Sequence, residues 1–440
     1  MKTLQTEGMI YHGATIRVIL ACVICDTPAR AFVKRVKGHS GYGGCDRCTQ
    51  NGEWFGKIIF PETDAPLRTD VQFDEMTDDE HHLPGVGKSP FTQLSVGMVS
   101  RFPLDYMHLV CLGVTKKLLM LWMKGPVGIK CRIGSTAVNL LSEIITSYSS
   151  YIPREFHRKG RSLRDIDRWK ATEYRLFLLY TGPVALSSVL SPVLYRNFLL
   201  FFTGITCLIS PKLSRYFCDY AQELLCLFVH NFADLYGRDM LVYNVHALVH
   251  LSDDVKNFGP LDNFSAFAFE SYLGEIKKML RTPNQPLQQV IRRFSEKQSV
   301  GHPQRRKTTR TENENLRCKH TDGPLLRGMD AVTQYKEIQT PDIFISRSRG
   351  DNCVNINDEV CIIRNLILQS DNEKTVIYEK FIDKKDFFTY PLSSSNIGVY
   401  KVSQLSRHLE ITLLRNVKNK YVLLPKDNEY IALPLLHREN

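Results

Sequence analysis

The sequence lacks the features that would place the chain in a membrane or outside the cell. Its longest apolar run, FLLFFTGITCLIS from Phe198, is shorter than the roughly 20 residues that a helix needs to cross a bilayer. The N-terminal residues MKTLQTEGMI contain no apolar core of a cleavable leader. The 12 cysteines are irregularly spaced in a chain of 440 residues, far longer than a small disulfide-bonded domain. We therefore expect no membrane span and reduced thiols inside a cell.

Acidic residues are fewer than basic ones, with 46 Asp and Glu against 57 Lys and Arg, and the formal net charge is +11. A surface with this surplus attracts polyanions, and nucleic acid is the first candidate. The alternative is a basic protein without a particular anionic partner. Apolar residues make up 43% of the chain, which is typical of a packed globular protein, and the length allows two or three domains.

The first hundred residues predict an α/β segment. Residues 14–25, ATIRVILACVIC, are a β-branched apolar run that predicts a strand ending just before Asp26. Thr27 can cap, and Pro28 can open, a short helix through residues 29–38. Ligands bind at the carboxyl ends of strands in α/β sheets, so this position suits Asp26 for chemistry. An aspartate that only caps the helix or a turn is the alternative.

Two cysteines in a glycine-rich turn have the spacing of half a zinc site. Cys45 and Cys48 form a CxxC pair in GYGGCDRC, and two thiolates at this spacing can bind one face of a tetrahedral zinc ion. Unligated turn cysteines and a redox pair are the alternatives, although no thioredoxin-like pattern surrounds them. The candidates for the missing ligands are His108 and one of His39, His81, His82 or Asp105.

A long apolar helix is predicted for residues 102–125, FPLDYMHLVCLGVTKKLLMLWMKG, with Gly125 as its stop. Asp105 and His108 lie in its first turn, three residues apart and therefore on one face. Both residue types bind metals, so a pair at the mouth of an apolar helix is a candidate site.

The middle of the chain predicts helices almost throughout. Residues 129–262 repeat apolar residues at helical spacing, which indicates an all-helical insertion. Residues 263–299 predict a further helix with Glu270 near its start. The stripe expected to be buried on that helix consists of Leu273, Ile276 and Leu280.

The last part of the chain changes character twice. Residues 300–325 are polar and charged, which predicts a linker or exposed arm. Its Arg305, Arg306 and Lys307 are candidates for nucleic-acid binding or nuclear import, although a solvated linker is the commoner meaning of such a run. Residues 326–440 alternate with a period of two, which predicts a small β-barrel or sandwich that binds or packs rather than catalyses.

Three acidic residues lie at the boundaries of predicted elements: Asp26 after a strand, and Asp105 and Glu270 at the starts of helices. Carboxylates that converge from separate elements bind Mg²⁺, and two such ions can activate water and stabilise the leaving oxygen in phosphodiester cleavage. The alternative for each residue is an acid that the dipole favours at a helix N-terminus.

Three segments, in this order, resemble the CACTA (En/Spm-like) DNA transposases and animal proteins derived from them. The segments are VICDTPARAFVKRVKGHSGYGGCDRCTQNGEW, FPLDYMHLV and FAFESYLGEIKKML. The resemblance covers residues 1 to about 300 and implies an RNase H-like core with a D–D–E metal triad, interrupted by a helical insertion. It implies that Asp26 is the second acid and Glu270 the closing glutamate. Mg²⁺ would then be the cofactor of DNA strand cleavage and transfer.

The same resemblance assigns the remaining motifs. Cys45 and Cys48 match the family's CxxC, and Asp105 with His108 matches its DxxH. The resemblance implies that this second pair lies near the active site and helps the cysteines hold a metal or braces the core. Glu173 in WKATEYRLF is a rival for the closing glutamate, but its position in the middle of a predicted helix makes it the weaker choice.

One feature departs from the family pattern. In relatives the first acid lies on the first core strand in an Asp-Gly setting, whereas residues 1–25 contain no aspartate. We therefore expect the chain to begin partway through the core, which leaves the fold truncated at its N-terminus. Two carboxylates without the third would bind the metal pair poorly, so this form is expected to be inactive as a transposase.

The predicted architecture is an incomplete α/β RNase H-like core with an all-helical insertion, followed by a small all-β module. Its boundaries are 1–128 for the partial core, 129–262 for the insertion, 263–299 for the final core helix, 300–325 for the linker and 326–440 for the module. The expected partner is DNA, with a homo-oligomer left open. The expected location is the nucleus, or the cytoplasm if the import signal does not function.

Two other functions compete with this hypothesis. The main alternative is a non-enzymatic nuclear protein, derived from a transposase, that binds DNA or a protein partner. A zinc-dependent hydrolase centred on Cys45, Cys48 and His108 is weaker, because the sequence contains no HExxH or comparable general-base motif.

Overall fold

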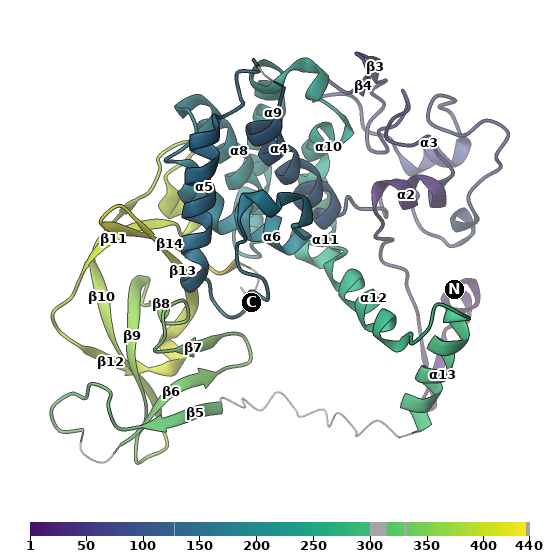
Figure 1. The fold of residues 1–440 in the computed structure, drawn as a ribbon. Coiled ribbons are helices and arrows are strands. Elements are labelled where there is room, and N and C mark those ends of the chain that lie inside the picture. The colour runs from purple at the N-terminus through teal and green to yellow at the C-terminus, as the bar shows by residue number, and fades with distance from the viewer. Residues whose placement is uncertain (127, 300–314, 330–331, 437–440) are drawn as a thin grey trace.

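The computed structural model of the protein describes residues 1–126, 128–299, 315–329 and 332–436. They form an N-terminal segment, a helical block, an arm of two helices and a β module (Figure 1). The predicted nucleic-acid cluster of Arg305, Arg306 and Lys307 lies outside the described residues.

The N-terminal segment contains short elements and little sheet. Strand β2 ends at Ile16, where a strand to residue 25 was predicted, and only Cys25 makes a further bridge, parallel to Leu104. A strand needs a neighbour to satisfy its backbone groups, and described residues 1–101 hold nothing larger than two-stranded hairpins. The RNase H-like core therefore stays a prediction. The elements are α1 Lys2–Thr6, β1 Met9–Tyr11, β2 Ala14–Ile16, α2 Thr27–Lys34, β3 Glu53–Trp54, β4 Ile58–Ile59 and α3 Asp70–Glu75.

Helix α2 begins directly after Asp26. Oδ1 of Asp26 accepts a hydrogen bond from the backbone N–H of Ala29 at 2.8 Å, so Asp26, and not Thr27, is the N-cap. The helix ends at Lys34 because Arg35 adopts a left-handed conformation with φ of 59°. The position predicted for chemistry thus also has a structural role.

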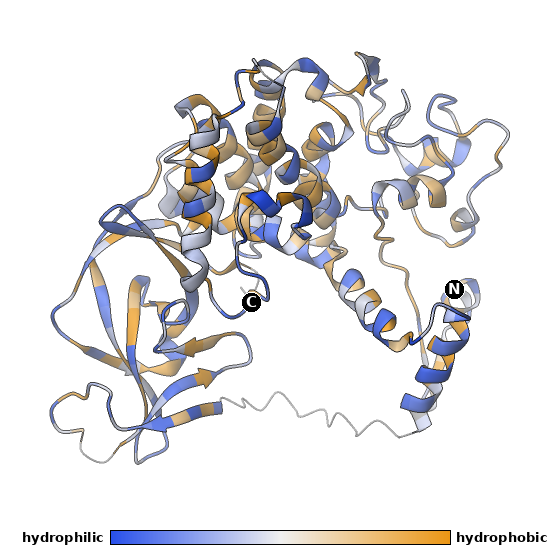
Figure 2. Cartoon of the chain, in the orientation of Figure 1, coloured by the Kyte–Doolittle hydropathy of each residue, from blue (hydrophilic) through white to orange (hydrophobic). Residues whose placement is uncertain are grey.

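The helical block is built around α8, whose apolar character Figure 2 shows. Phe201 of α8 stacks on Phe228 of α9 with ring centroids 5.0 Å apart. Gly204 permits this approach, since a Cβ there would lie 3.1 Å from Cγ of Leu225. By length and composition α8 could cross a membrane, but 78% of it is buried inside the protein. The helices are α4 Lys116–Lys124, α5 Ser135–Ser147, α6 Ala171–Leu176, α7 Gly182–Leu186, α8 Pro192–Ile209, α9 Ser214–Tyr236, α10 Tyr243–His246 and α11 Leu251–Phe258.

Helices α12 (Phe267–Met279) and α13 (Pro286–Ser299) form an arm that projects from the helical block (Figure 1). The prediction of a buried stripe on α12 is wrong, because this helix has no buried residue. Leu273 is 49% exposed, and Phe269 is 53% exposed. Periodicity marks an apolar face, but burial requires a second element, and the described part of the chain leaves this face largely open.

The β module contains a closed barrel. Strands β8, β9, β10, β11, β14 and β13 pair antiparallel in a ring, in which each strand bonds to the next and β13 returns to β8. Closure removes the free edges of these six strands. The strands are β5 Asn315–His320, β6 Thr333–Gln339, β7 Phe344–Ser346, β8 Cys353–Ile356, β9 Glu359–Leu368, β10 Lys374–Asp386, β11 Tyr400–Leu405, β12 Glu410–Leu413, β13 Val417–Lys426 and β14 Glu429–Pro434.

The β module shares its core with the helical block. Lys420 of β13 is fully buried, and its Nζ donates to Glu155 Oε2 at 2.8 Å, Asp351 Oδ1 at 2.5 Å and the carbonyl of Phe344 at 2.7 Å. Glu155 belongs to the helical block and also accepts from the backbone N–H of Phe344 at 3.1 Å. One apolar cluster runs through both parts. The module is thus packed as part of a larger body.

Candidate metal centre

Four buried side chains bring their metal-binding atoms together between the N-terminal segment and the helical block. The Sγ atoms of Cys45 and Cys48 are 3.5 Å apart, and both thiols are free. Nε2 of His246 lies 3.3 Å from Sγ of Cys48, and Nε2 of His250 lies 3.7 Å from Sγ of Cys45. The two Nε2 atoms are 3.3 Å apart. This buried Cys₂His₂ cluster could hold a metal ion.

The distances fit one tetrahedral ion. Metal–sulfur bonds of about 2.3 Å and metal–nitrogen bonds of about 2.0 Å give edges of about 3.8 Å between sulfurs, about 3.5 Å between sulfur and nitrogen and about 3.3 Å between nitrogens. The observed edges are 3.5, 3.3, 3.7 and 3.3 Å. Four protein donors fill a tetrahedral site and leave no open position for a substrate, so such a centre supports structure rather than catalysis.

The two halves of the cluster come from different kinds of local structure. The cysteines lie in a glycine-rich loop, where a Cβ on Gly43 would lie 2.1 Å from the backbone oxygen of Glu80. The histidines are four residues apart at the end of α10 and the turn after it, and therefore on one face. Nδ1 of His246 lies 3.0 Å from the carbonyl of Glu62, which accepts its proton and leaves Nε2 free to bind a metal.

The electrostatics of the thiols favour one thiolate. Burial raises the pKa of Cys45, but hydrogen bonds with Cys48, His246 and His250 outweigh burial and leave the pKa well below its ordinary value. The hydrogen bond with Cys45 and burial raise the pKa of Cys48. These shifts favour the thiolate of Cys45, and a metal ion would replace the protons of the two thiols.

The two residues inside the CxxC motif fix the loop to its neighbours. Asp46 pairs with Arg30 of α2 through Oδ2 and Nε, 2.6 Å apart, and accepts a hydrogen bond from Tyr243 at 2.9 Å. Burial raises the pKa of Asp46, but the charges of Arg30 and Lys34 outweigh burial and hold the pKa below its ordinary range. This network joins α2, the loop and the start of α10.

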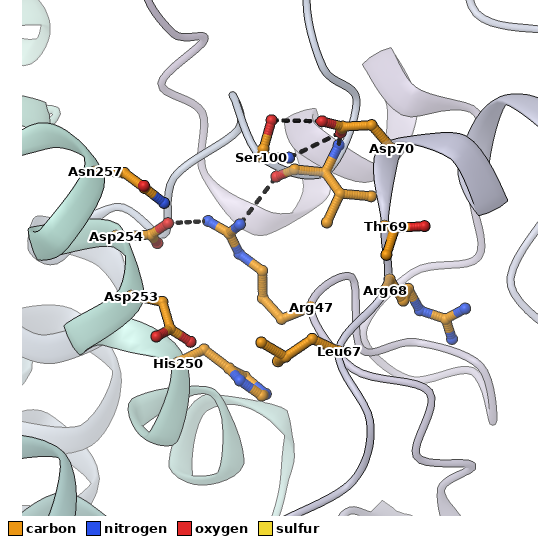
Figure 3. A pocket seen from close by; sticks show the side chains of 11 residues that line it. Arg47, Leu67, Arg68, Thr69, Asp70, Ser100, His250, Asp253, Asp254 and Asn257 are labelled. Carbon is orange, nitrogen blue, oxygen red and sulfur yellow. Dashed lines mark hydrogen bonds and ion pairs between the residues drawn. The ribbon is translucent and has the colours of Figure 1, made fainter.

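A cavity of about 310 Å³ lies beside the cluster, with His250 in its wall (Figure 3). Arg47 crosses it, forms an ion pair with Asp254 of α11 and donates to the carbonyl of Val99 at 2.9 Å. Oδ2 of Asp254 accepts from the backbone N–H of Leu104 at 2.8 Å, and burial raises the pKa of this aspartate. The cavity walls are thus cross-linked by the ion pair of Arg47 and Asp254 and by hydrogen bonds from both side chains to the backbone.

A second site surrounds His108. Asp105 accepts hydrogen bonds from Nδ1 of His108 at 2.5 Å and from the backbone N–H of Ala266 at 2.6 Å, at the start of α12. The hydrogen bond with Asp105 raises the pKa of His108, burial opposes the shift, and the charges of Asp105, Asp26 and Glu270 raise it further. Residues from three distant segments therefore act on one imidazole.

The predicted residues divide between these two sites. Cys45 and Cys48 belong to the Cys₂His₂ cluster, whereas Asp105 and His108 are not among its four donors. Oδ1 of Asp26 accepts the capping hydrogen bond of α2, and its other oxygen remains for a cation. Glu270 is exposed, so its oxygens also remain for a cation.

The remaining candidate residues from the sequence lie outside the Cys₂His₂ cluster. His39 is exposed, and burial lowers the pKa of His81 to about 3 and also lowers that of His82. Arg161 binds both oxygens of Glu173, at 2.6 and 2.8 Å, and Oε2 also accepts from the backbone N–H of Lys170, the N-cap of α6, at 2.8 Å.

His246 and His250 were missed by sequence reasoning, although the sequence carried a signal for them. HALVH has the H-x₃-H spacing that accompanies CxxC pairs in zinc sites. The separation of 198 residues between Cys48 and His246 is far greater than in a small zinc finger, so local spacing alone could not join the two halves.

Comparisons with known proteins bear only on the β module. A family described as a domain of unknown function (DUF8592) matches residues 319–435. No curated protein and no solved structure matches the chain. The family match lies outside both the Cys₂His₂ cluster and the site around His108, and its description assigns no activity.

Proposed function

We propose that the Cys₂His₂ cluster binds a structural zinc ion. Two thiols and two imidazoles, fully buried and tetrahedral in their spacing, are a donor set that suits zinc, and the carbonyl behind His246 supplies the outer hydrogen bond typical of zinc ligands. Metal analysis of the purified protein tests this proposal. We expect one zinc ion per chain, and a protein with no bound metal would overturn the assignment.

We further propose that the chain is a transposase-derived protein of the nucleus that binds DNA. The observation that carries this proposal is the convergence on His108 of Asp26, Asp105 and Glu270, the acids that the sequence resemblance singles out. These acids come from three separate segments of the chain. Two of the segments are joined by a hydrogen bond of 2.6 Å from the backbone N–H of Ala266, at the start of α12, to Asp105. Three acids of the resemblance motifs, from three segments of the chain, thus act on the one imidazole of His108.

The arm that carries Glu270 supplies a surface for a polyanion. Residues 267–299 contain six Lys and Arg against three Asp and Glu. Lys277 and Arg281 are exposed, and neither forms an ion pair with a residue that the structure describes. Exposed cations of this kind bind DNA phosphates and release condensed counterions, which makes affinity fall steeply with salt.

Removing two of these charges is expected to weaken DNA binding and its salt dependence. In the double variant Lys277→Gln/Arg281→Gln, the slope of log K against log salt should fall by roughly 1.8, at about 0.9 per phosphate contact. Fluorescence anisotropy with a labelled duplex measures the slope. The matched control, Lys336→Gln/Lys385→Gln, removes two exposed charges from the β module and should leave the slope unchanged.

No binding of the wild type at low salt would remove the DNA-binding function. It would favour the alternative of an interaction protein whose partner is another protein and whose charge is incidental.

Strand cleavage is the activity that the sequence resemblance implies, and Asp26 and Glu270 both retain free oxygens for it near His108. Asp105 contributes less, since each of its oxygens already accepts hydrogen bonds. With two available acids we expect no nicking of supercoiled plasmid in Mg²⁺, and none in the Glu270→Gln variant. Nicking by the wild type that Glu270→Gln abolishes would instead establish a metal-dependent nuclease.

A further inference from the structure

The barrel of the β module is filled at one end and open at the other. A small apolar cluster, with Val360, Val402 and Tyr421 among its members, packs inside it. At the open end a cavity of about 200 Å³ remains, bounded by the barrel and by Tyr151 of the helical block. The mouths of small barrels are common ligand sites, because the closed ring holds the walls in place.

The floor and walls of this cavity are apolar and aromatic. Phe381 of β10 and Tyr430 of β14 lie with ring centroids 6.1 Å apart. Tyr151 forms the outer wall and stacks under the guanidinium of Arg349 at 4.6 Å. The remaining apolar lining consists of Cys353, Ile362, Leu405 and Leu423.

The rim carries positive charge. Arg364 binds Glu379 through a single carboxylate oxygen, Oε2, with Nε at 2.6 Å. Arg349 is exposed, and it forms no ion pair with a residue in the described part of the chain. A ligand that enters past this rim meets one uncompensated guanidinium, stacked on an aromatic ring and therefore held in position.

We propose that this barrel mouth binds an acidic peptide segment of a partner protein, which inserts one large apolar side chain into the cavity. A volume of about 200 Å³ suits one such side chain, since a dry apolar cavity of about 150 Å³ already accepts benzene. An acidic residue beside the anchor pairs with Arg349, whose guanidinium has no carboxylate partner among the described residues. Charge complementarity with a chain of net charge +11 adds to the attraction.

A nucleobase fits the same cavity less well. Each base carries several donors and acceptors around its ring, and the cavity offers them the amide of Asn352 but no partner from Ile362, Leu405 and Leu423. Buried polar groups without partners cost binding free energy, whereas an apolar side chain loses nothing there. The cavity therefore favours a peptide anchor, and its function is independent of the DNA-binding arm.

Fluorescence anisotropy with labelled heptapeptides tests the proposal on the full chain. The panel carries Leu, Met, Phe, Tyr or Trp at the centre between Asp and Glu residues. Matched peptides have Ala at the centre or Lys as flanking residues. We expect at least one acidic peptide to bind, with the Ala-centred form about 10-fold to 100-fold weaker and the Lys-flanked form at least tenfold weaker. A single-stranded octanucleotide is tested beside them.

Two variants tie the binding to the cavity. Arg349→Glu should weaken the acidic peptide at least tenfold, while Arg327→Glu, the same change at an exposed arginine outside the cavity lining, should not. Leu405→Trp, at a half-buried position of the mouth, should block every peptide without lowering the melting temperature. The proposal is overturned if no acidic peptide binds at about 1 mM, if Leu405→Trp leaves binding intact, or if the oligonucleotide competes for this cavity.

Discussion

Replacing Cys48 with serine is expected to abolish zinc binding and to loosen the N-terminal segment on the helical block. Serine cannot supply the thiolate, so Cys45, His246 and His250 would remain as three buried polar groups without a shared ion. Structural zinc contributes about 10–16 kcal/mol of binding free energy in small zinc-finger peptides. We therefore expect a loss of at least about 4 kcal/mol in the free energy of unfolding, and a lower melting temperature.

Hydrogen exchange resolves where this loss occurs. The loop around Cys45 and Cys48 has little regular secondary structure, and its long-range anchors include the cluster, the ion pairs of Asp46 and Arg47, and the hydrogen bond from Arg68 to the carbonyl of Cys45. Loss of the metal should raise exchange there more than in α8.

A second cysteine serves as the control for this prediction. Cys131 is also fully buried but lies outside the cluster, so Cys131→Ser keeps the zinc and costs only the burial of a hydroxyl, about 1–3 kcal/mol. Equal losses from Cys48→Ser and Cys131→Ser, or a wild type whose melting temperature a strong chelator does not change, would contradict the zinc assignment.

The zinc hypothesis also fixes the sign of the pH dependence. A metal requires deprotonated thiols and neutral imidazoles, so the unfolded, metal-free chain binds more protons than the folded, metal-bound one. Stability then rises with pH wherever those ligands titrate in the unfolded chain, and acid releases the metal. The hydrogen bonds that hold the pKa of Cys45 below its ordinary value favour the thiolate that a metal requires.

Half of this centre could be predicted from the sequence, and the reason is geometric. Cys45 and Cys48 lie close together in the chain, so their spacing alone indicates a shared ligand. The other two ligands, His246 and His250, come from a distant part of the chain. Asp105 and His108 also have a spacing that suits metal ligands, so the sequence left them as candidates for the same positions. The tertiary packing of α10 on the glycine-rich loop decides between them, and no local pattern encodes that contact.

The fold shows the same division between local and long-range information. The periodicity of residues 192–209 predicts a helix, and α8 spans Pro192–Ile209, because helix formation depends on neighbours along the chain. The apolar run over residues 14–25 predicts a strand, yet β2 stops at Ile16 because a strand also needs a partner strand. Alternation predicts the strands of the β module, while closure of the ring depends on the pairing of β13 with β8.

The second large effect is expected for Lys420→Met, which should lower the free energy of unfolding by about 3–5 kcal/mol. The side chain of Lys420 is fully buried, and its ammonium is the shared partner of Glu155 and Asp351. Removing the cation leaves two carboxylates in a site from which water is excluded, and breaking a buried ion pair from one side has a cost of this size. Chemical denaturation measures the change.

The comparison with Lys418→Met separates burial from charge. Lys418 is exposed and pairs with Asp358 at 3.1 Å, so its loss should change the free energy of unfolding by less than about 1 kcal/mol. The triple variant Lys420→Met/Glu155→Gln/Asp351→Asn should recover part of the loss, because neutral amides need no cation.

Since the triad joins the helical block to the β module, the wild type should unfold both parts in one transition. Equal losses from the two lysine variants would contradict the cost assigned to burial, and separate transitions in the wild type would show that the two parts are independently stable.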